Sequence, residues 1–109
     1  MIEHNDDLTI LAEGEEYYIG ICTCCNVINL VYRNIAIKLS EEQFEYFKNY
    51  LNELQEEYYS LKSRTGKSIF MSSSNPNIVF CFSIKELHEL RKLLNESSLM
   101  LEINKIFKS

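Results

Sequence analysis

Hydrophobic and polar positions along this chain follow the period of a strand and then the period of a helix, and this change happens twice. The stretch 34–54 reads NIAIKLSEEQFEYFKNYLNEL, and a second stretch, 77–97, reads NIVFCFSIKELHELRKLLNES and aligns with it without a gap. In each copy the period changes directly after a serine, Ser40 in the first and Ser83 in the second. The pattern therefore predicts a strand that leads into a helix, made twice.

Both predicted helices begin with a capping box. Ser40 is followed three residues later by Gln43, and Ser83 is followed three residues later by Glu86. At this spacing the side chain of each residue in the pair accepts a hydrogen bond from the backbone N–H of the other. Helical spacing then continues through Phe44, Phe47, Leu51, Leu54 and Tyr58 in the first copy and through Leu87, Leu90, Leu94 and Leu101 in the second. The first helix is predicted to fade over 60–65 and to end by Gly66.

Runs of β-branched and aromatic residues predict the strands. They lie at Tyr17–Cys22, Val27–Tyr32, Ile35–Leu39, Lys67–Met71 and Asn77–Phe82, with a short edge strand near Leu8–Leu11. Asn26 and Asn34 stand in the two tight connections, and asparagine tolerates positive φ. The expected fold is α+β in two layers: an antiparallel sheet of four to five strands with two helices on one face. We expect a single domain, 1–109, of pseudo-duplicated β-β-α units that cover approximately 27–60 and 67–107.

Apolar side chains remain after this core is assigned. In the second helix a further set points roughly 100–200° away from the leucine stripe, at about 3.6 residues per turn; it comprises Leu93, Met100, Ile103, Ile106 and Phe107. The outer face of the sheet is also apolar, with Val27, Val31, Ala36, Val79 and Cys81. A helix that is apolar on two sides must be covered on two sides, which favours a homodimer. The interface residues expected are Leu93, Met100, Ile103 and Phe107; either the N-terminal segment or a second subunit covers the outer sheet face.

Charge and hydropathy exclude several classes of partner. The 109 residues carry a net charge of −5, with 11 basic residues scattered among 16 acids, so nucleic acid is not expected as a partner. No apolar run approaches the roughly 20 residues that span a bilayer, and the acidic N-terminus lacks the features of a signal peptide. We therefore expect a cytoplasmic protein that contacts no membrane, with its four cysteines present as thiols or metal ligands.

Candidate chemistry is confined to the cysteine-rich turn. Cys22 and Cys25 resemble half of a zinc knuckle at a hairpin turn, and His4 is a further candidate ligand. The other soft or imidazole donors are Cys24, Cys81 and His88. A redox role is disfavoured because reactive Cys-x-x-Cys pairs sit at helix N-termini, whereas this pair lies between two strands.

Catalytic constellations are absent from the sequence pattern. The adjacent acids of the first predicted helix do not share a face, and no acid is embedded in an apolar run that would raise its pKa. We therefore expect no enzymatic activity. The leading interpretation is a non-enzymatic homodimeric interaction or regulatory module without a cofactor, and the alternative is a zinc-binding protein.

The order of motifs resembles a known family. The Cys22-x-x-Cys25 pair is followed by NVINLVY over 26–32, NIAIKLSEEQF over 34–44 and FCFSIKELHEL over 80–90. This arrangement resembles small uncharacterised bacterial proteins, found mainly in Bacteroidota, that form a domain of unknown function. The resemblance implies a small cytoplasmic protein, and it transfers no catalytic or binding residue.

Overall fold

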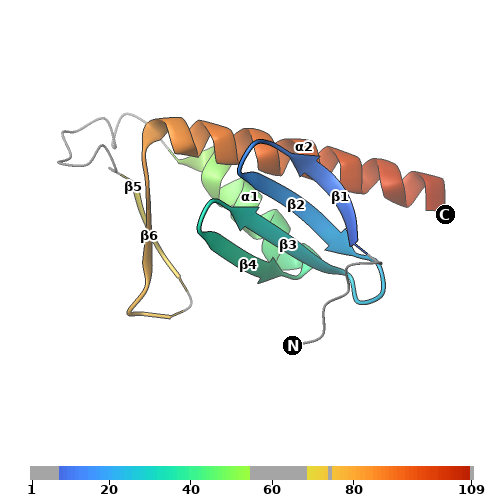
Figure 1. The fold of residues 1–109 in the computed structure, drawn as a ribbon, viewed down its shortest axis with the longest axis horizontal. Helices are drawn as coiled ribbons and strands as arrows, with labels where there is room; N and C mark the ends of the chain where they lie inside the picture. The colour runs from blue at the N-terminus through green and yellow to red at the C-terminus, as the bar shows by residue number, and fades with distance from the viewer. Residues whose placement is uncertain (1–7, 55–68, 74, 109) are drawn as a thin grey trace.

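A computed structural model describes residues 8–54, 69–73 and 75–108, and this part of the chain contains six strands and two helices (Figure 1). The elements are, in order, β1 (Leu8–Glu13), β2 (Tyr17–Cys22), β3 (Val27–Tyr32), β4 (Ile35–Leu39), α1 (Glu41–Glu53), β5 (Ile69–Ser72), β6 (Val79–Phe82) and α2 (Ile84–Lys108). The predicted α+β class is confirmed. No helix in the described ranges is long and apolar enough to cross a membrane.

The first four strands form one antiparallel sheet in the order β1-β2-β3-β4. Tyr17 pairs with Tyr32 at one end of β2 and Cys22 pairs with Val27 at the other, so consecutive strands are joined by short turns. Because side chains alternate between faces, this register places the apolar residues of neighbouring strands on one face. The buried residues of that face are Ile19, Ile21, Ile28, Leu30 and Tyr32.

Both helices pack against this sheet, α2 over β1 and β2 and α1 over β3 and β4. They run antiparallel, because contacts advance along one helix as they retreat along the other: Glu41 with Lys105, Glu45 with Ser98, and Asn52 with Asn95. Both predicted capping boxes form. The Ser40 and Ser83 hydroxyls each accept from the backbone N–H three residues on, at 3.1 Å.

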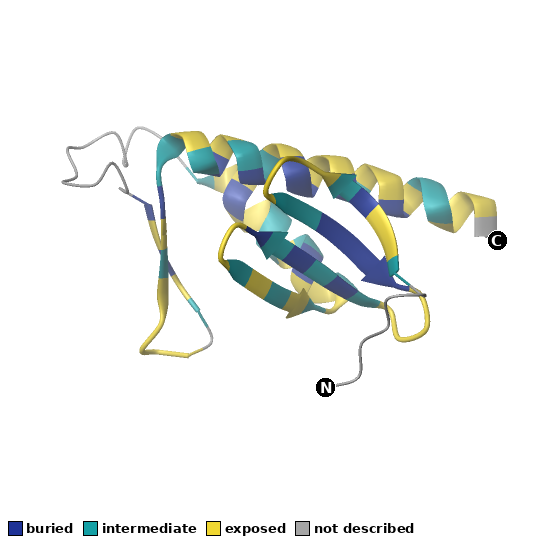
Figure 2. Cartoon of the chain, viewed as in Figure 1, coloured by how far each residue is buried: buried dark blue, intermediate teal, exposed yellow. Residues whose placement is uncertain are grey.

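One hydrophobic core lies between these layers (Figure 2). Phe44 and Leu51 of α1 and Leu87 and Leu94 of α2 are each 0% exposed. Packing of the helices' apolar stripes against the inner sheet face therefore accounts for the burial pattern predicted from helical spacing.

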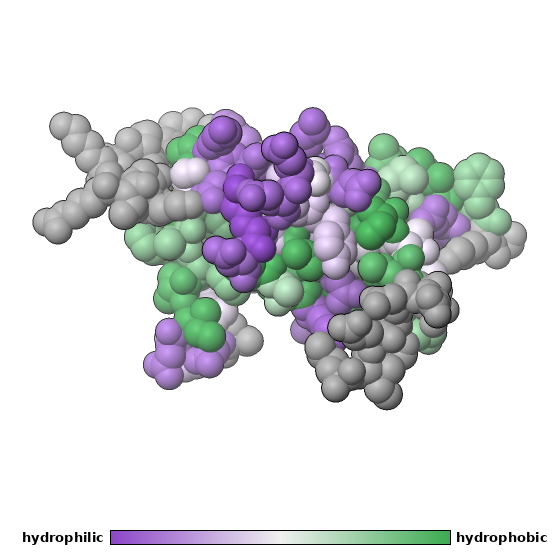
Figure 3. Space-filling model, in the orientation of Figure 1, coloured by the Kyte–Doolittle hydropathy of each residue, from purple (hydrophilic) through white to green (hydrophobic). Residues whose placement is uncertain are grey.

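The hairpin of β5 and β6 departs from the predicted continuous sheet. These strands pair with each other and form a separate two-stranded sheet. One face of the hairpin, with Ile69, Met71 and Phe82, joins the common core. The other face is exposed and apolar (Figure 3). Ile78, which the repeat aligns with Ile35, is 49% exposed. The hairpin–helix order occurs twice, but the two units do not extend one sheet, and their duplication stays a prediction.

The first helix is shorter than predicted. It ends at Glu53, because Leu54 adopts an extended conformation with ψ 132. Arg91 of α2 donates to the backbone oxygens of Leu51 and Leu54 at 2.7 and 2.5 Å, which satisfies carbonyls that a continuing helix would have paired internally. The predicted stripe residue Tyr58 lies outside the described residues.

The leucine stripe of α2 is interrupted by a buried serine. Ser97 stands between Leu94 and Leu101 and is 0% exposed, and its hydroxyl has no hydrogen-bond partner within the part of the chain described. An unpaired buried hydroxyl costs free energy. Ser97→Ala is therefore expected to raise the free energy of unfolding by about 1 kcal/mol, measured by urea denaturation.

The neighbouring serine provides the matched control for that substitution. The Ser98 hydroxyl donates to Glu45 at 3.1 Å and accepts from Lys48 at 3.3 Å, so Ser98→Ala removes hydrogen bonds and is expected to destabilise. Destabilisation by both substitutions would show that the Ser97 hydroxyl contributes to folding.

Arg33, in the β3–β4 turn, has a left-handed backbone with φ 54, where we had predicted Asn34 for this conformation. Its side chain explains the difference, because it is held on three carboxylates: Glu16 at 2.5 Å, Glu89 at 3.3 Å and Glu86 at 3.7 Å. The guanidinium also lies 5.3 Å from the centroid of the Tyr32 ring. These contacts offset the conformational cost and join the turn to the start of α2.

The Tyr32 hydroxyl donates to Glu89 at 2.6 Å and sets up a pH dependence. This hydrogen bond, followed by that from Arg33, lowers the pKa of Glu89 below its ordinary 4.5. Burial, and then the same hydrogen bond, raise the pKa of Tyr32 to about 12. A carboxylate with a lowered pKa stabilises the fold above its unfolded pKa, and the stabilisation is lost as pH falls through the folded value.

Tyr32→Phe is therefore expected to make the stability of the protein less dependent on pH below about 4.5. Urea denaturation at neutral pH and at several points below pH 4.5 measures this slope. Equal slopes for the variant and the unmodified protein would contradict the assigned role of the Tyr32–Glu89 hydrogen bond.

Candidate metal centre

The turn between β2 and β3 brings three cysteines together. Residues Thr23, Cys24, Cys25 and Asn26 form this turn, and the Asn26 N–H donates to the Cys22 backbone oxygen at 2.7 Å. Asn26 has φ 57, which confirms the predicted positive-φ corner. The chain therefore reverses directly after Cys22 and returns the next two cysteines toward it.

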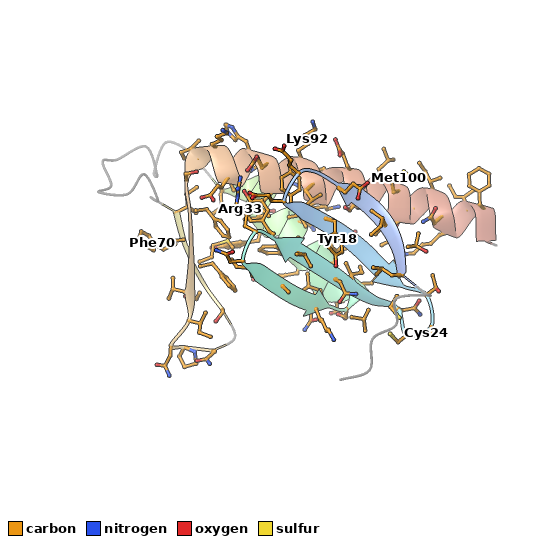
Figure 4. All side chains as sticks on the ribbon, in the orientation of Figure 1. Tyr18, Cys24, Arg33, Phe70, Lys92 and Met100 are labelled. Atoms are coloured by element: carbon orange, nitrogen blue, oxygen red, sulfur yellow. The ribbon has the colours of Figure 1, made fainter. Side chains whose placement is uncertain are left out.

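The three sulfur atoms form a compact cluster. The Sγ atoms of Cys22, Cys24 and Cys25 all lie within 4.8 Å of one another. The Sγ atoms of Cys22 and Cys24 lie 3.0 Å apart. Cys22 is buried at the end of β2, whereas Cys24 and Cys25 are exposed, so a solute can reach the cluster from solvent. Figure 4 shows Cys24 at the end of the sheet, far from Phe70 in the β5–β6 hairpin.

Hydrogen bonding among the thiols separates their acidities. Hydrogen bonds from the Cys24 side chain and then the Cys25 side chain lower the pKa of the Cys22 thiol. The same Cys22–Cys24 bond raises the pKa of the Cys24 thiol to about 12. The hydrogen bonds from its neighbours therefore favour the thiolate form of Cys22. Thiolate is the form of cysteine that binds metals.

The sulfur positions fit one metal ion with a small adjustment. Zinc binds thiolate sulfur at about 2.3 Å in tetrahedral geometry, which places neighbouring sulfurs about 3.8 Å apart. The Cys22–Cys24 separation of 3.0 Å would have to widen to reach the sulfur–sulfur distance of a zinc site. The other sulfur–sulfur separations are at most 4.8 Å, which is compatible with that distance. Exposed turn side chains can make this adjustment without moving the strands. Three thiolates leave one of the four tetrahedral positions for a further ligand.

The predicted ligands divide into three groups. Cys22 and Cys25 lie in the cluster, and Cys24, which we had named only as a further donor, lies there with them. Cys81 stands on β6 and His88 on α2, and neither belongs to the cluster. His4 lies outside the described residues. The signal that could have identified Cys24 is the turn itself, because three cysteines within four residues around a tight reversal must converge.

The predicted interface residues are not all accessible. Leu93 is 2% exposed and packs in the core of the single chain, so its assignment to an interface is wrong. Its position is covered because α2 is flanked by both the sheet and α1. Met100 and Phe107 are 38% and 84% exposed, and Ile103 is half-buried. With Leu99 and Ile106 they form hydrophobic surface over the second half of α2 (Figure 3).

Comparison with known proteins gives a family and no activity. Residues 4–107 match the family described as "Family of unknown function (DUF6686)". No curated protein matches the chain, and no solved structure matches it. The resemblance inferred from the motifs, to a family of unknown function, is thereby confirmed, while the bacterial group named with it stays a prediction.

Proposed function

Because the chain belongs to this family of unknown function, DUF6686, we propose its function from the cysteine cluster: it binds a zinc ion through Cys22, Cys24 and Cys25. We propose further that the role is non-enzymatic and that the protein works in the cytoplasm, where thiols remain reduced.

The observation that carries the proposal is the convergence of three sulfurs on one exposed turn. A buried structural cysteine acts as a small apolar residue and needs no thiol neighbour. Cys24 and Cys25 are exposed, so packing does not explain why cysteine occupies both positions. Soft thiolate ligands select zinc, copper(I) and iron–sulfur centres, and zinc is the ion for which a tetrahedral site with three thiolates and one further ligand is ordinary.

The sheet register bears on the fourth ligand. Leu8, the first described residue of β1, pairs with Cys22, so the chain enters the sheet beside the cluster. His4 precedes Leu8 by four residues, a span of at most about 14 Å when extended. The connecting residues are therefore long enough for His4 to reach the site. His4 as the fourth ligand stays a hypothesis from the sequence, and water is the alternative.

Elemental analysis of protein purified without chelator tests the proposal. We expect one zinc per chain, and we expect it to be lost in a Cys22→Ser/Cys25→Ser variant and retained in Cys81→Ser, which removes an exposed thiol outside the cluster. His4→Ala separates the two fourth-ligand hypotheses, because it weakens binding only if the imidazole is a ligand. Protein that carries no zinc and takes up none when titrated would overturn the proposal.

A second candidate function, a homodimeric interaction module, is favoured by the exposed apolar side chains of α2. We propose that Met100, Ile103 and Phe107 contribute to self-association, since Phe107 is 84% exposed and Ile106 is 70% exposed. Light scattering at tens of micromolar, a range typical of weak association, tests this. A Phe107→Ser variant should shift the protein from dimer to monomer. A strictly monomeric unmodified protein would exclude the proposed self-association.

A further inference from the structure

A groove of about 780 Å³ lies between α1 and β5, at the opposite end of the molecule from the cysteine turn (Figure 4). One side of the groove carries aromatic side chains of α1 and the other is strand β5. The principal lining residues are Tyr46, Phe47 and Tyr50 of α1 and Phe70, Met71 and Ser72 of β5. Tyr46 and Phe70 are 65% and 63% exposed, so large rings meet solvent at the mouth of this groove.

The groove follows the edge of β5 and not one of its faces. Phe70, Met71 and Ser72 are consecutive, and consecutive side chains on a strand point to opposite faces. Met71 packs in the core, whereas Phe70 and Ser72 point outward, yet all three line the groove. No residue of β6 lines it. Only the edge of β5 that is turned away from β6 borders both faces in this way.

Within the described part of the chain, that edge carries backbone groups without a strand partner. The Ser73 N–H donates to the Ile78 oxygen at 3.2 Å, which fixes the alternation of the β5–β6 ladder. Residues that exchange hydrogen bonds across an antiparallel pair recur at every second position, so Met71 pairs with Phe80 in this way. Phe70 and Ser72 then direct their N–H and C=O groups to the free edge, and within the described ranges β5 pairs only with β6.

We propose that this groove binds an extended peptide segment of a partner protein, which adds as a third strand to β5. Strand addition uses an open edge for main-chain hydrogen bonds and adjoining pockets for alternate side chains, and both are present. The backbone groups of Phe70 and Ser72 hold the main chain of the peptide. Tyr46 and Tyr50 contact every second side chain, which is apolar.

Charge selects a basic segment. Among the described residues that line the groove, Glu42 is the only charged one, and it stands in the acidic first turn of α1. The chain as a whole carries a net charge of −5. A second copy would bring the same negative charge to the groove, whereas lysine or arginine beside the apolar positions complements Glu42. The occupant is therefore a partner peptide that alternates apolar and basic residues.

A fluorescein-labelled eight-residue peptide that alternates valine and lysine is a suitable probe, measured by fluorescence polarisation. Two N-methylated forms, one methylated at every valine and one at every lysine, each lose the donors of one strand edge. One form should bind like the parent peptide, and the other should bind at least about tenfold more weakly, because it lacks the hydrogen bonds to β5. A peptide with glutamate in place of lysine should also bind more weakly.

Two surface substitutions locate the binding site on the protein. Tyr46→Ala and Glu42→Gln should each weaken binding of the parent peptide. For Tyr46→Ala we expect a loss of about tenfold, as for an aromatic contact residue. Lys92→Ala, which removes a side chain of α2 that is 78% exposed and does not line the groove, should leave affinity unchanged. The proposal would be overturned if the peptide does not bind at concentrations up to about 1 mM, the range of weak complexes. It would also be overturned if both methylated forms lose affinity equally or if Tyr46→Ala has no effect on affinity. A dimer that dissociates as the peptide binds would overturn it too, since a second copy would then occupy the groove.

Discussion

Replacing Cys24 by serine is expected to weaken zinc binding about 10²- to 10³-fold. Structural zinc sites with four ligands are worth roughly 10–16 kcal/mol, so one thiolate contributes about 3–4 kcal/mol, and each 1.4 kcal/mol is a factor of ten. Serine keeps the size and polarity of the side chain but supplies no thiolate. Competition with a chromophoric chelator at fixed pH measures the affinity.

Cys24 is the informative position because the sequence pattern alone emphasised Cys22 and Cys25. Its Sγ lies 3.0 Å from that of Cys22, and its pKa is raised to about 12, so metal must displace a tightly held proton. Zinc affinity should consequently rise with pH as protons are released on binding. Cys81→Ser is the control and should bind as the unmodified protein does. Equal affinities for Cys24→Ser and Cys81→Ser would remove Cys24 from the ligand set.

Replacing Phe44 by alanine is expected to lower the free energy of unfolding by about 3–5 kcal/mol. Phe44 is 0% exposed and belongs to the hydrophobic core between the helices and the sheet. Its removal leaves a cavity that the surrounding leucines and isoleucines cannot fill without moving the helix. Urea denaturation followed by circular dichroism measures the loss, which is a large share of the stability of a small domain.

Tyr46→Ala, two positions further along the same helix, is the matched control. Tyr46 is 65% exposed, so its truncation should change stability by less than about 0.5 kcal/mol. The comparison also shows that Tyr46→Ala is folded when it is used to test the peptide groove. Similar losses for Phe44→Ala and Tyr46→Ala would contradict the assigned orientation of α1.

Much of the architecture could be predicted because local signals agree with the fold. The serine caps, the period-2 strands and the leucine stripe each depend on neighbouring residues, and the structure confirms them at Ser40, Ser83 and Leu87–Leu94. The pairing of β5 and β6 in a separate sheet could not be predicted in the same way. Which strand lies beside which depends on long-range packing, and the similarity of the two repeats favoured one continuous sheet.

The exposed surfaces were predicted less well than the core for a related reason. Leu93 belongs to the core because α2 is covered from two directions within one chain, which helical periodicity does not reveal. The Arg33 cluster joins carboxylates 17 and more residues away in sequence, at Glu16, Glu86 and Glu89. No local pattern indicates such contacts, and the groove beside β5 likewise exists only once the hairpin is placed.

The cysteine site lies between these cases. The turn and its left-handed Asn26 follow from local chemistry, whereas the convergence of three sulfurs follows from how the turn is folded. The Cys-x-x-Cys spacing of a zinc knuckle favoured Cys22 and Cys25 over Cys24 in the sequence interpretation. That spacing does not show whether Cys24 also reaches the ion, because this depends on how the turn is folded.

X-ray absorption spectroscopy at the zinc edge, on the unmodified protein loaded with one equivalent of zinc, examines the proposed ligand set directly. We predict a first shell of three sulfur atoms at about 2.3 Å and one lighter atom at about 2.0–2.1 Å. A shell composed of nitrogen and oxygen alone, or one that keeps three sulfurs when Cys22 and Cys25 are both serine, would contradict a zinc site at the β2–β3 turn.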